Sequence, residues 1–245
     1  MKIILVAGAR PNFMKIAPLM SEVLKNIELQ PLLLHTGQHY DPEMSDIFFE
    51  QLGIPKPNIF LGFGSGSHAE QTAKVMLEFE KVCLNEKPDV VLVVGDVNST
   101  LACALVAAKM NIHVAHVEAG LRSRDRTMPE EINRLVTDSI SDFLFTPSED
   151  ADFNLIQEGV AKEKIHFVGN IMIDSLVHIL PRIRSSDILR RMQVEHGKYV
   201  CVTLHRPANV DNEGTLRELL GGFETVSRIM PVVFPVHPRT RKVLE

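Results

Sequence analysis

The stretch PDVVLVVGDVNSTLACALVAAK, residues 88–109, contains one strand followed directly by one helix. The uninterrupted Val and Leu side chains at residues 90–94 are typical of a strand that is buried on both faces. Gly95 and Asp96 end this run, and the segment that follows them, which carries Ala102 and Leu105, predicts a helix. A buried strand that leads into a helix is the repeating unit of a parallel sheet.

The same alternation extends over most of the chain. Short runs rich in Val, Ile and Leu alternate with segments of helical periodicity, and Ser67 followed by Glu70 predicts a capping box at the start of one helix. We expect strands at residues 3–7, 32–36, 90–94, 112–117, 143–146 and 165–168. The pattern predicts an α/β fold, a Rossmann-like parallel sheet with helices on both faces.

A charged stretch without a strand pattern, residues 181–198, divides the chain. We therefore predict a Rossmann-like domain over residues 1–180, a linker over 181–198 and the truncated start of a second Rossmann-like domain over 199–245. This last part contains two predicted strands, 199–205 and 232–236, and one predicted helix, about 215–229. Two strands cannot bury both faces of a sheet. We expect either a fragment of a longer protein or a sheet that something else covers.

Composition excludes several classes of protein. The net charge of -5 over 245 residues gives no broad basic surface for nucleic acid. The three cysteines lack C-x-x-C spacing, which argues against zinc and disulfides and fits a reducing cytoplasm. His113 and His116 lie three apart on a predicted strand and face opposite sides, so they are a poor metal pair. No apolar run approaches the roughly 20 residues of a membrane span.

Charged side chains follow the strands at the edge where ligands of open parallel sheets bind. Arg10 and Lys15 follow the first strand, and two cations there suit an anionic group such as a diphosphate. Three carboxylates, Asp96, Glu118 and Glu130, come after later strands. Carboxylates that converge in one crevice are typical of a site that exchanges protons.

Two of these carboxylates also have a purely structural explanation. Glu130 stands three residues after Thr127 and four before Arg134, so a capping box and an i,i+4 ion pair would account for it. Asp96 has the position of an N-cap for the helix that follows it. Glu118 ends an apolar strand, where no such explanation applies. Spacing alone leaves the first two alternatives open.

A series of sequence runs along the whole chain resembles the non-hydrolysing UDP-N-acetylglucosamine 2-epimerases, in the order in which that family has them. These runs are GARPNFMKIAPL, HTGQHY, PDVVLVVGDVNSTLA, HVEAGLRS, MPEEINR, GN-x-x-ID, TLHRPANVDN and PVHPRT. The resemblance implies a glycosyltransferase-B-like architecture, with a sugar nucleotide between two Rossmann-like domains. It further implies a cytoplasmic homodimer, formed through the first domain, that uses neither a metal nor an organic cofactor.

The resemblance also implies roles for individual residues. The substrate would be bound by Arg10, Lys15 and Arg134, and the catalytic residues would be Asp96, Glu118, Glu130 and His205. In some bacterial members a second, regulatory nucleotide-sugar site lies in the segments that here contain Gln38, His39 and His237. Which carboxylate acts as the acid and which as the base stays open, as do the roles of Arg122, Arg124, Asp125 and Arg126.

The reaction that the resemblance implies interconverts UDP-GlcNAc and UDP-ManNAc, for polysaccharide biosynthesis. UDP is eliminated to give 2-acetamidoglucal, and it adds back after proton exchange at C2. Family members continue well beyond the end of this chain, so we expect the chain to be truncated and inactive alone. Three alternatives stay open: a sugar-nucleotide glycosyltransferase of similar fold, a hydrolysing epimerase that releases free ManNAc, and a non-catalytic fragment that only folds and dimerises.

Overall fold

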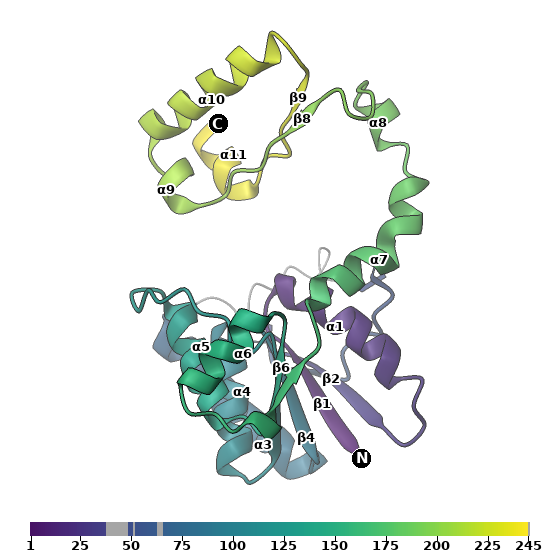
Figure 1. Ribbon diagram of the computed structural model, residues 1–245, viewed down its shortest axis with the longest axis vertical. Coiled ribbons are helices and arrows are strands. Elements are labelled where there is room, and N and C mark those ends of the chain that lie inside the picture. The colour runs from purple at the N-terminus through teal and green to yellow at the C-terminus, as the bar shows by residue number, and fades with distance from the viewer. Residues whose placement is uncertain (38–48, 51, 63–65, 245) are drawn as a thin grey trace. The chain divides into compact units, whose positions relative to one another are not determined.

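The computed structural model describes residues 1–37, 49–50, 52–62 and 66–244, with the backbone alone at residues 10, 207 and 238. The chain divides into two compact units, Met1–Leu180 and Pro181–Glu245. We refer to them as unit 1 and unit 2. Their elements are labelled in Figure 1.

Unit 1 is built on a parallel sheet. Its seven strands within the described residues are ordered β3-β2-β1-β4-β5-β6-β7, and every neighbouring pair is parallel. The strands are β1 (Lys2–Ala7), β2 (Gln30–His35), β3 (Ile59–Phe60), β4 (Val90–Val94), β5 (His113–Val117), β6 (Phe143–Thr146) and β7 (Ile165–Phe167). The helices are α1 (Arg10–Val23), α3 (His68–Glu86), α4 (Asn98–Lys109), α5 (Pro129–Ile140), α6 (Glu149–Gln157), the 3₁₀ helix η1 (Lys162–Lys164) and α7 (Ile171–Arg184).

Helices cover both faces of this sheet, which explains why its central strands are apolar throughout. On one face the side chains of β1 and β4 pack against Phe79 of α3 and Cys103 of α4. On the other face they pack against Phe13 and Ile16 of α1. Alternate residues of one strand enter the two cores, since a strand directs successive side chains to opposite faces.

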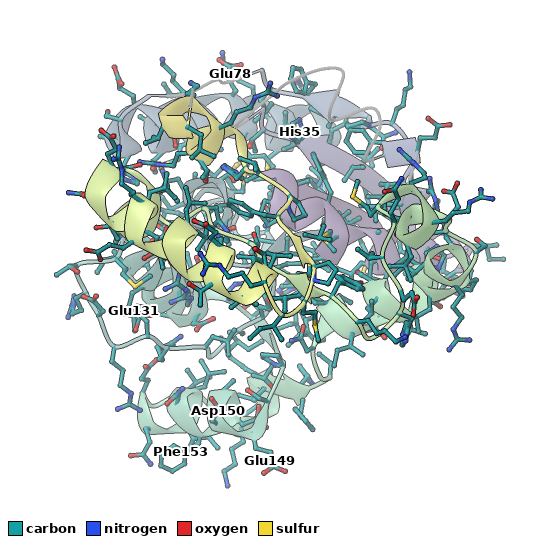
Figure 2. All side chains as sticks on the ribbon, turned by 90° about the horizontal axis from the view of Figure 1, so that it is seen from above. His35, Glu78, Glu131, Glu149, Asp150 and Phe153 are labelled. Atoms are coloured by element: carbon teal, nitrogen blue, oxygen red, sulfur yellow. The ribbon has the colours of Figure 1, made fainter. Side chains whose placement is uncertain are left out.

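Local sequence features set the helix ends. At the start of α3 the backbone N–H of Glu70 donates to Ser67 Oγ at 3.2 Å, and the backbone N–H of Ser67 donates to Glu70 Oε2 at 3.0 Å. The predicted capping box is thus present. Helix α6 buries Ala151 and leaves Glu149, Asp150 and Phe153 exposed, the residues labelled on it in Figure 2.

Unit 2 contains a two-stranded parallel sheet and short helices. Its elements are α8 (Ile188–Arg191), β8 (Val200–Cys201), α9 (Pro207–Val210), α10 (Glu213–Ser227), β9 (Val232–Val233) and α11 (Pro238–Leu244). The Asn212 side chain caps α10 by accepting from the backbone N–H of Thr215 at 3.1 Å. Among the described residues of this unit, the buried side chains are those of Val210, Leu216 and Thr240.

The predicted α/β fold with a Rossmann-like parallel sheet is confirmed. The six strands expected in unit 1 all occur, and β4 and β6 have the predicted bounds. Strand β3 was not expected, because two residues at a sheet edge leave no apolar run to recognise. The strands of unit 2 are shorter than predicted, with two residues each.

Candidate active site

The site begins where the strand order of unit 1 reverses, between β1 and β4. From β1 the chain proceeds outward to β2 and β3, and then returns to β4 on the other side of β1. Helices that leave neighbouring strands in opposite directions open a crevice at the carboxyl ends of those strands. The segments after β1, β4 and β5 meet at this edge.

Asn12 fixes the turn after β1. Its Oδ1 accepts the backbone N–H groups of Gly8, at 3.1 Å, and of Ala9, at 2.8 Å. Its Nδ2 donates to the carbonyl oxygen of Val94, the last residue of β4, at 3.2 Å. The turn after the first strand is therefore tied to the end of the fourth. Arg10 begins α1 within this turn, and its side chain lies outside the described atoms.

An ion pair between Lys15 and Glu118 lies at this edge of the sheet. It joins α1 to the residue directly after β5, and both side chains are largely buried, with exposed fractions of 13% and 16%. Gly95 lies beside the pair, since a Cβ atom added there would be 2.8 Å from Lys15 Nζ and 3.4 Å from Glu118 Oε2. Gly95 also has a φ of +68°, which favours glycine. A larger residue would therefore disturb the pair.

Glu118 itself has a left-handed backbone, with a φ of +73°. Such a conformation costs a non-glycine residue about 1–3 kcal/mol and persists only where the surroundings impose it. Here the backbone N–H groups of Glu118 and Ala119 both donate to the carbonyl oxygen of Phe145 in β6, each at 3.1 Å. The strained turn directs the Glu118 carboxylate to Lys15. Backbone strain at a carboxylate in a crevice is typical of functional sites.

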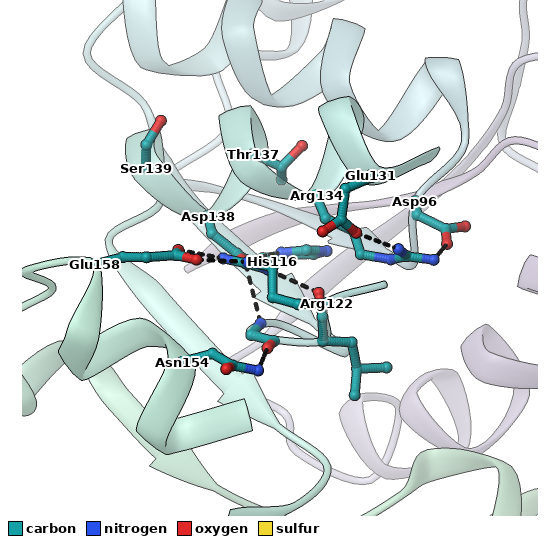
Figure 3. A network of polar contacts seen from close by, with 12 residues as sticks. Asp96, His116, Arg122, Glu131, Arg134, Thr137, Asp138, Ser139, Asn154 and Glu158 are labelled. Carbon is teal, nitrogen blue, oxygen red and sulfur yellow. Dashed lines mark hydrogen bonds and ion pairs between the residues drawn. The ribbon is translucent and has the colours of Figure 1, made fainter. Parts of the chain in front are cut away.

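A second cluster of charges lies after β4 (Figure 3). Arg134 of α5 donates from Nη2 to Asp96 Oδ2 at 2.6 Å and from Nη1 to Glu131 Oε2 at 2.7 Å. Burial alone would lower the pKa of Arg134, but the two carboxylates raise it. The N-cap of α4 is Val97, so the alternative in which Asp96 caps that helix is wrong. Asp96 instead forms an ion pair, and its side chain is 29% exposed.

Glu131 has a structural role that the sequence did not indicate. Its carboxylate accepts the backbone N–H groups of Ser123 and Arg124, each at 2.9 Å, and also the Ser123 hydroxyl at 3.1 Å. Burial works to raise the pKa of Glu131, but these hydrogen bonds and Arg134 lower it to about 2. Glu131, labelled in Figure 2, therefore holds the loop after β5 in place as a buried anion.

Its neighbour Glu130 is not held in this way. Helix α5 has Met128 as its N-cap and begins at Pro129, so the predicted capping box with Thr127 is wrong. Thr127 donates from Oγ1 to Asp125 Oδ1 at 2.6 Å instead. Arg134 bonds other carboxylates, so the predicted pair with Glu130 is wrong too. Within the described part of the chain, the Glu130 side chain forms no hydrogen bond or ion pair.

Amide side chains connect the turn at Asp96 to α3 and α4. Asn133 Nδ2 donates to the carbonyl oxygen of Asp96 at 2.8 Å and to Asn98 Oδ1 at 3.2 Å. Asn98 Nδ2 in turn donates to Gln71 Oε1 at 3.0 Å. Because Asn133 and Asn98 are buried, this network fixes the Asp96 turn against two helices. Nothing in the sequence distinguished these amides from solvated surface residues.

The cations after β5 have separate roles. Arg122 is buried and donates from Nη1 to Asp138 Oδ2 at 2.7 Å and from Nη2 to Glu158 Oε2 at 2.6 Å. Arg124 donates to Asn154 Oδ1 at 3.2 Å. Arg122, Arg124 and Asp125 therefore shape the loop. Arg126 is exposed, as expected of a solvated residue.

Comparisons with known proteins identify the family. The family model described as UDP-N-acetylglucosamine 2-epimerase matches residues 21–245. The chain belongs to the UDP-N-acetylglucosamine 2-epimerase family. It is 49% identical over 247 residues to a UDP-N-acetylglucosamine 2-epimerase homolog of Methanococcus maripaludis, covering all of this chain and 68% of that protein.

Two further members of the family are similar to this chain over its whole length. The Methanocaldococcus jannaschii UDP-GlcNAc 2-epimerase, solved in complex with UDP-GlcNAc and UDP, matches with a TM-score of 0.87 and 45% identity over all of this chain and 68% of that one. A UDP-2,3-diacetamido-2,3-dideoxy-D-glucuronate 2-epimerase of Pseudomonas aeruginosa is 44% identical over 248 residues, which are all of this chain and 69% of that protein. The chain therefore spans about two thirds of these family members.

The structure brings together four of the site residues that the family resemblance implied, as the pairs Lys15–Glu118 and Asp96–Arg134. Glu130 lies in the first turn of α5, the helix that carries Arg134. In unit 2, the exposed side chains of His205 and His237 have ring centroids 6.0 Å apart. Gln38 and His39 lie outside the described residues, so the regulatory site stays a prediction.

The described ranges also bear on metal binding and on membrane insertion. No group of three or more His, Cys, Asp or Glu side chains in these residues is placed to hold one metal ion. No helix among them combines the length and the apolar character needed to cross a bilayer.

Proposed function

We propose that this chain carries the acid/base half of a non-hydrolysing epimerase that interconverts UDP-GlcNAc and UDP-ManNAc. The observation that carries the proposal is the Lys15–Glu118 ion pair at the strand-order reversal, beside the Asp96–Arg134 pair. Two carboxylates, each paired with a cation in one crevice, suit a reaction that moves a proton and separates a diphosphate from a sugar.

The chemistry requires both kinds of group to act together. The C2 proton of UDP-GlcNAc is not adjacent to a carbonyl, so its removal becomes feasible only while the C1–O bond to UDP breaks. Lys15, together with Arg10 at the start of α1, would stabilise the departing diphosphate. A diphosphate that engages Lys15 would also compete with Glu118 for that cation, and would free its carboxylate for the proton at C2.

Return of a proton to the opposite face of C2 requires a second group, which acts as the acid. Glu130 has no partner in the described part of the chain, and Asp96 is partly exposed while it bonds Arg134. Both are candidates for this step, because two carboxylates in different environments can divide the acid and base roles between them. By the family resemblance, His205 would help to stabilise the diphosphate of UDP as it departs.

Two features of the proposal rest on the family resemblance, a cytoplasmic location and a homodimer formed through the first domain. A third, the division into a first domain over residues 1–180, a linker over 181–198 and the truncated start of a second domain over 199–245, rests on the charged stretch between the two predicted domains. Gln38, His39 and His237 remain the proposed regulatory residues. UDP-2,3-diacetamido-2,3-dideoxy-D-glucuronate is the second candidate substrate. The Pseudomonas aeruginosa 2-epimerase named for it is 44% identical to this chain, and the Methanocaldococcus jannaschii UDP-GlcNAc 2-epimerase is 45% identical.

The test follows deuterium from heavy water into the product. The chain is assayed alone and joined to the part of the Methanocaldococcus jannaschii epimerase that it does not cover, with each UDP-sugar in turn. We expect UDP-ManNAc that carries deuterium at C2. Free ManNAc would indicate a hydrolysing enzyme, and sugar transfer to an acceptor without exchange would indicate a glycosyltransferase. Absence of turnover in both forms, with the intact M. jannaschii enzyme active as control, would refute the proposal.

A further inference from the structure

His116 is a fully buried polar side chain in the middle of an apolar sheet. It lies on β5, two residues before Glu118, and its side chain is 0% exposed. His113 on the same strand is exposed, as expected for residues three apart. A buried polar group needs hydrogen-bond partners, since leaving it unpaired costs the full desolvation of that group. The partners of His116 indicate what it does.

Both ring nitrogens of His116 face hydrogen-bond acceptors. Nδ1 lies 2.6 Å from Asp138 Oδ1, and Nε2 lies 2.8 Å from the carbonyl oxygen of Gly95. A carbonyl oxygen can only accept, so Nε2 must donate to Gly95. Asp138 Oδ2 is bonded by two groups that can only donate, the backbone N–H of Gly120 and Arg122 Nη1, and these donors favour the ionised carboxylate, whose Oδ1 then accepts from Nδ1. The ring satisfies both bonds only when it carries hydrogen on each nitrogen, that is, as a cation.

Asp138 extends this connection to the loop after β5 (Figure 3). Its Oδ2 accepts the backbone N–H of Gly120 at 3.0 Å and Arg122 Nη1 at 2.7 Å. One carboxylate on α5 thus bonds His116 with one oxygen and the loop after β5 with the other. Arg122 is itself paired with Glu158 of α6. The four charged side chains, two positive and two negative, balance one another.

The two backbone groups held in this way flank the Lys15–Glu118 pair. His116 bonds Gly95, and a Cβ atom added to Gly95 would be 2.8 Å from Lys15 Nζ. Gly120, bonded by Asp138, follows Glu118 by two residues and has a φ of +80°. Two left-handed positions, Gly95 and Gly120, are therefore each bonded by one member of this buried pair, and Glu118 stands two residues before the second of them.

We propose that His116, held by Asp138 as a buried imidazolium, is a positioning residue that ties the turn after β4 to the turn after β5 and so sets the Lys15–Glu118 geometry. The inference rests on the proposed function for its kinetic consequence. Its structural part, a cationic ring bonded on both sides, does not depend on which reaction the site performs.

The structural part is tested by NMR on the 15N-labelled chain at pH about 8, where an ordinary histidine is neutral. We expect one histidine whose two ring nitrogens have nearly equal 15N shifts, as in an imidazolium. Its signals should vanish in His116→Gln and remain in His113→Gln, the matched control on the same strand. We also expect slow amide exchange at Gly120. A neutral His116 ring would overturn the proposal, because one of its two hydrogen bonds would then be missing.

The positioning role is tested in whichever form epimerises a UDP-sugar. Gln in place of His116 can reach Gly95 or Asp138 but not both, so we expect kcat to fall on the order of 10²-fold with KM unchanged. His113→Gln should match the parent protein. A His116→Gln variant that folds and keeps the parental kcat would refute positioning. If no form turns over, the proposed function fails by itself, and the NMR result still decides whether the buried cation and its two bonds exist. If the His116→Gln variant does not fold, the NMR measurement on the parent protein decides the proposal.

Discussion

Two adjacent glutamates at the start of α5 should respond in opposite ways to the same substitution. In Glu131→Gln the buried anion is lost. The fall of the Glu131 pKa from 4.5 to about 2 corresponds to about 3 kcal/mol of unfolding free energy at neutral pH. We expect that loss, which for a unit of this size is a decrease in Tm of about 6–12 °C. In Glu130→Gln we expect a stability change within about 0.5 kcal/mol and a fall in kcat of about 10²-fold or more.

Urea unfolding followed by circular dichroism measures the first quantity, since the chain has no tryptophan. The deuterium assay measures the second. Each variant is the control for the other, because they differ by one position on the same helix and by no formal charge. The reasoning is refuted if Glu131→Gln unfolds at the same urea concentration as the parent, or if Glu130→Gln keeps full turnover.

Three further outcomes are expected. The stability difference between the parent and Glu131→Gln should be complete above pH about 4.5 and should close as the pH falls towards about 2, because a carboxyl with a lowered pKa stabilises the fold only while it is ionised. The pKa of Asp138 is also lowered, so its contribution to stability should likewise be lost in acid. Acid titration of unfolding measures both effects. Gly95→Ala should cost about 1–2 kcal/mol in urea unfolding, since alanine strains at positive φ, and should lower kcat by displacing Lys15. A thiol reagent should label Cys201 alone in the native chain and all three cysteines in urea, as counted by mass spectrometry.

The sheet of unit 1 was predictable because its strands are short runs rich in apolar residues, of which residues 90–94 are uninterrupted and end at Gly95. The strand at residues 90–94 has the predicted bounds for this reason. In unit 2 the apolar runs at 199–205 and 232–236 are longer than the strands they contain, because only two residues of each run pair with a neighbouring strand. The helix expected at 215–229 begins at Glu213, where the Asn212 side chain caps it.

The site was predictable only where residues follow strands directly. Lys15, Asp96 and Glu118 could be placed at one edge from strand ends alone. The division of labour between Glu130 and Glu131 could not be predicted, since it depends on which residue begins α5. The sequence does contain one relevant pattern. Glu131, Arg134 and Asp138 recur at three and four residues, so they share a helix face, on which Glu131 and Asp138 are buried.

The position of β1 in the interior of the sheet, between β2 and β4, has a consequence for synthesis of the chain on the ribosome. β1 emerges first, but one of its two neighbours is β4, at residues 90–94. The Lys15–Glu118 pair requires β5 in addition. Local helices can form early, whereas contacts this distant in sequence must wait, and loop closure makes them slow. The apolar edge of β1 therefore stays unprotected while about a third of the chain is made. We expect the nascent chain to depend on chaperones during that interval.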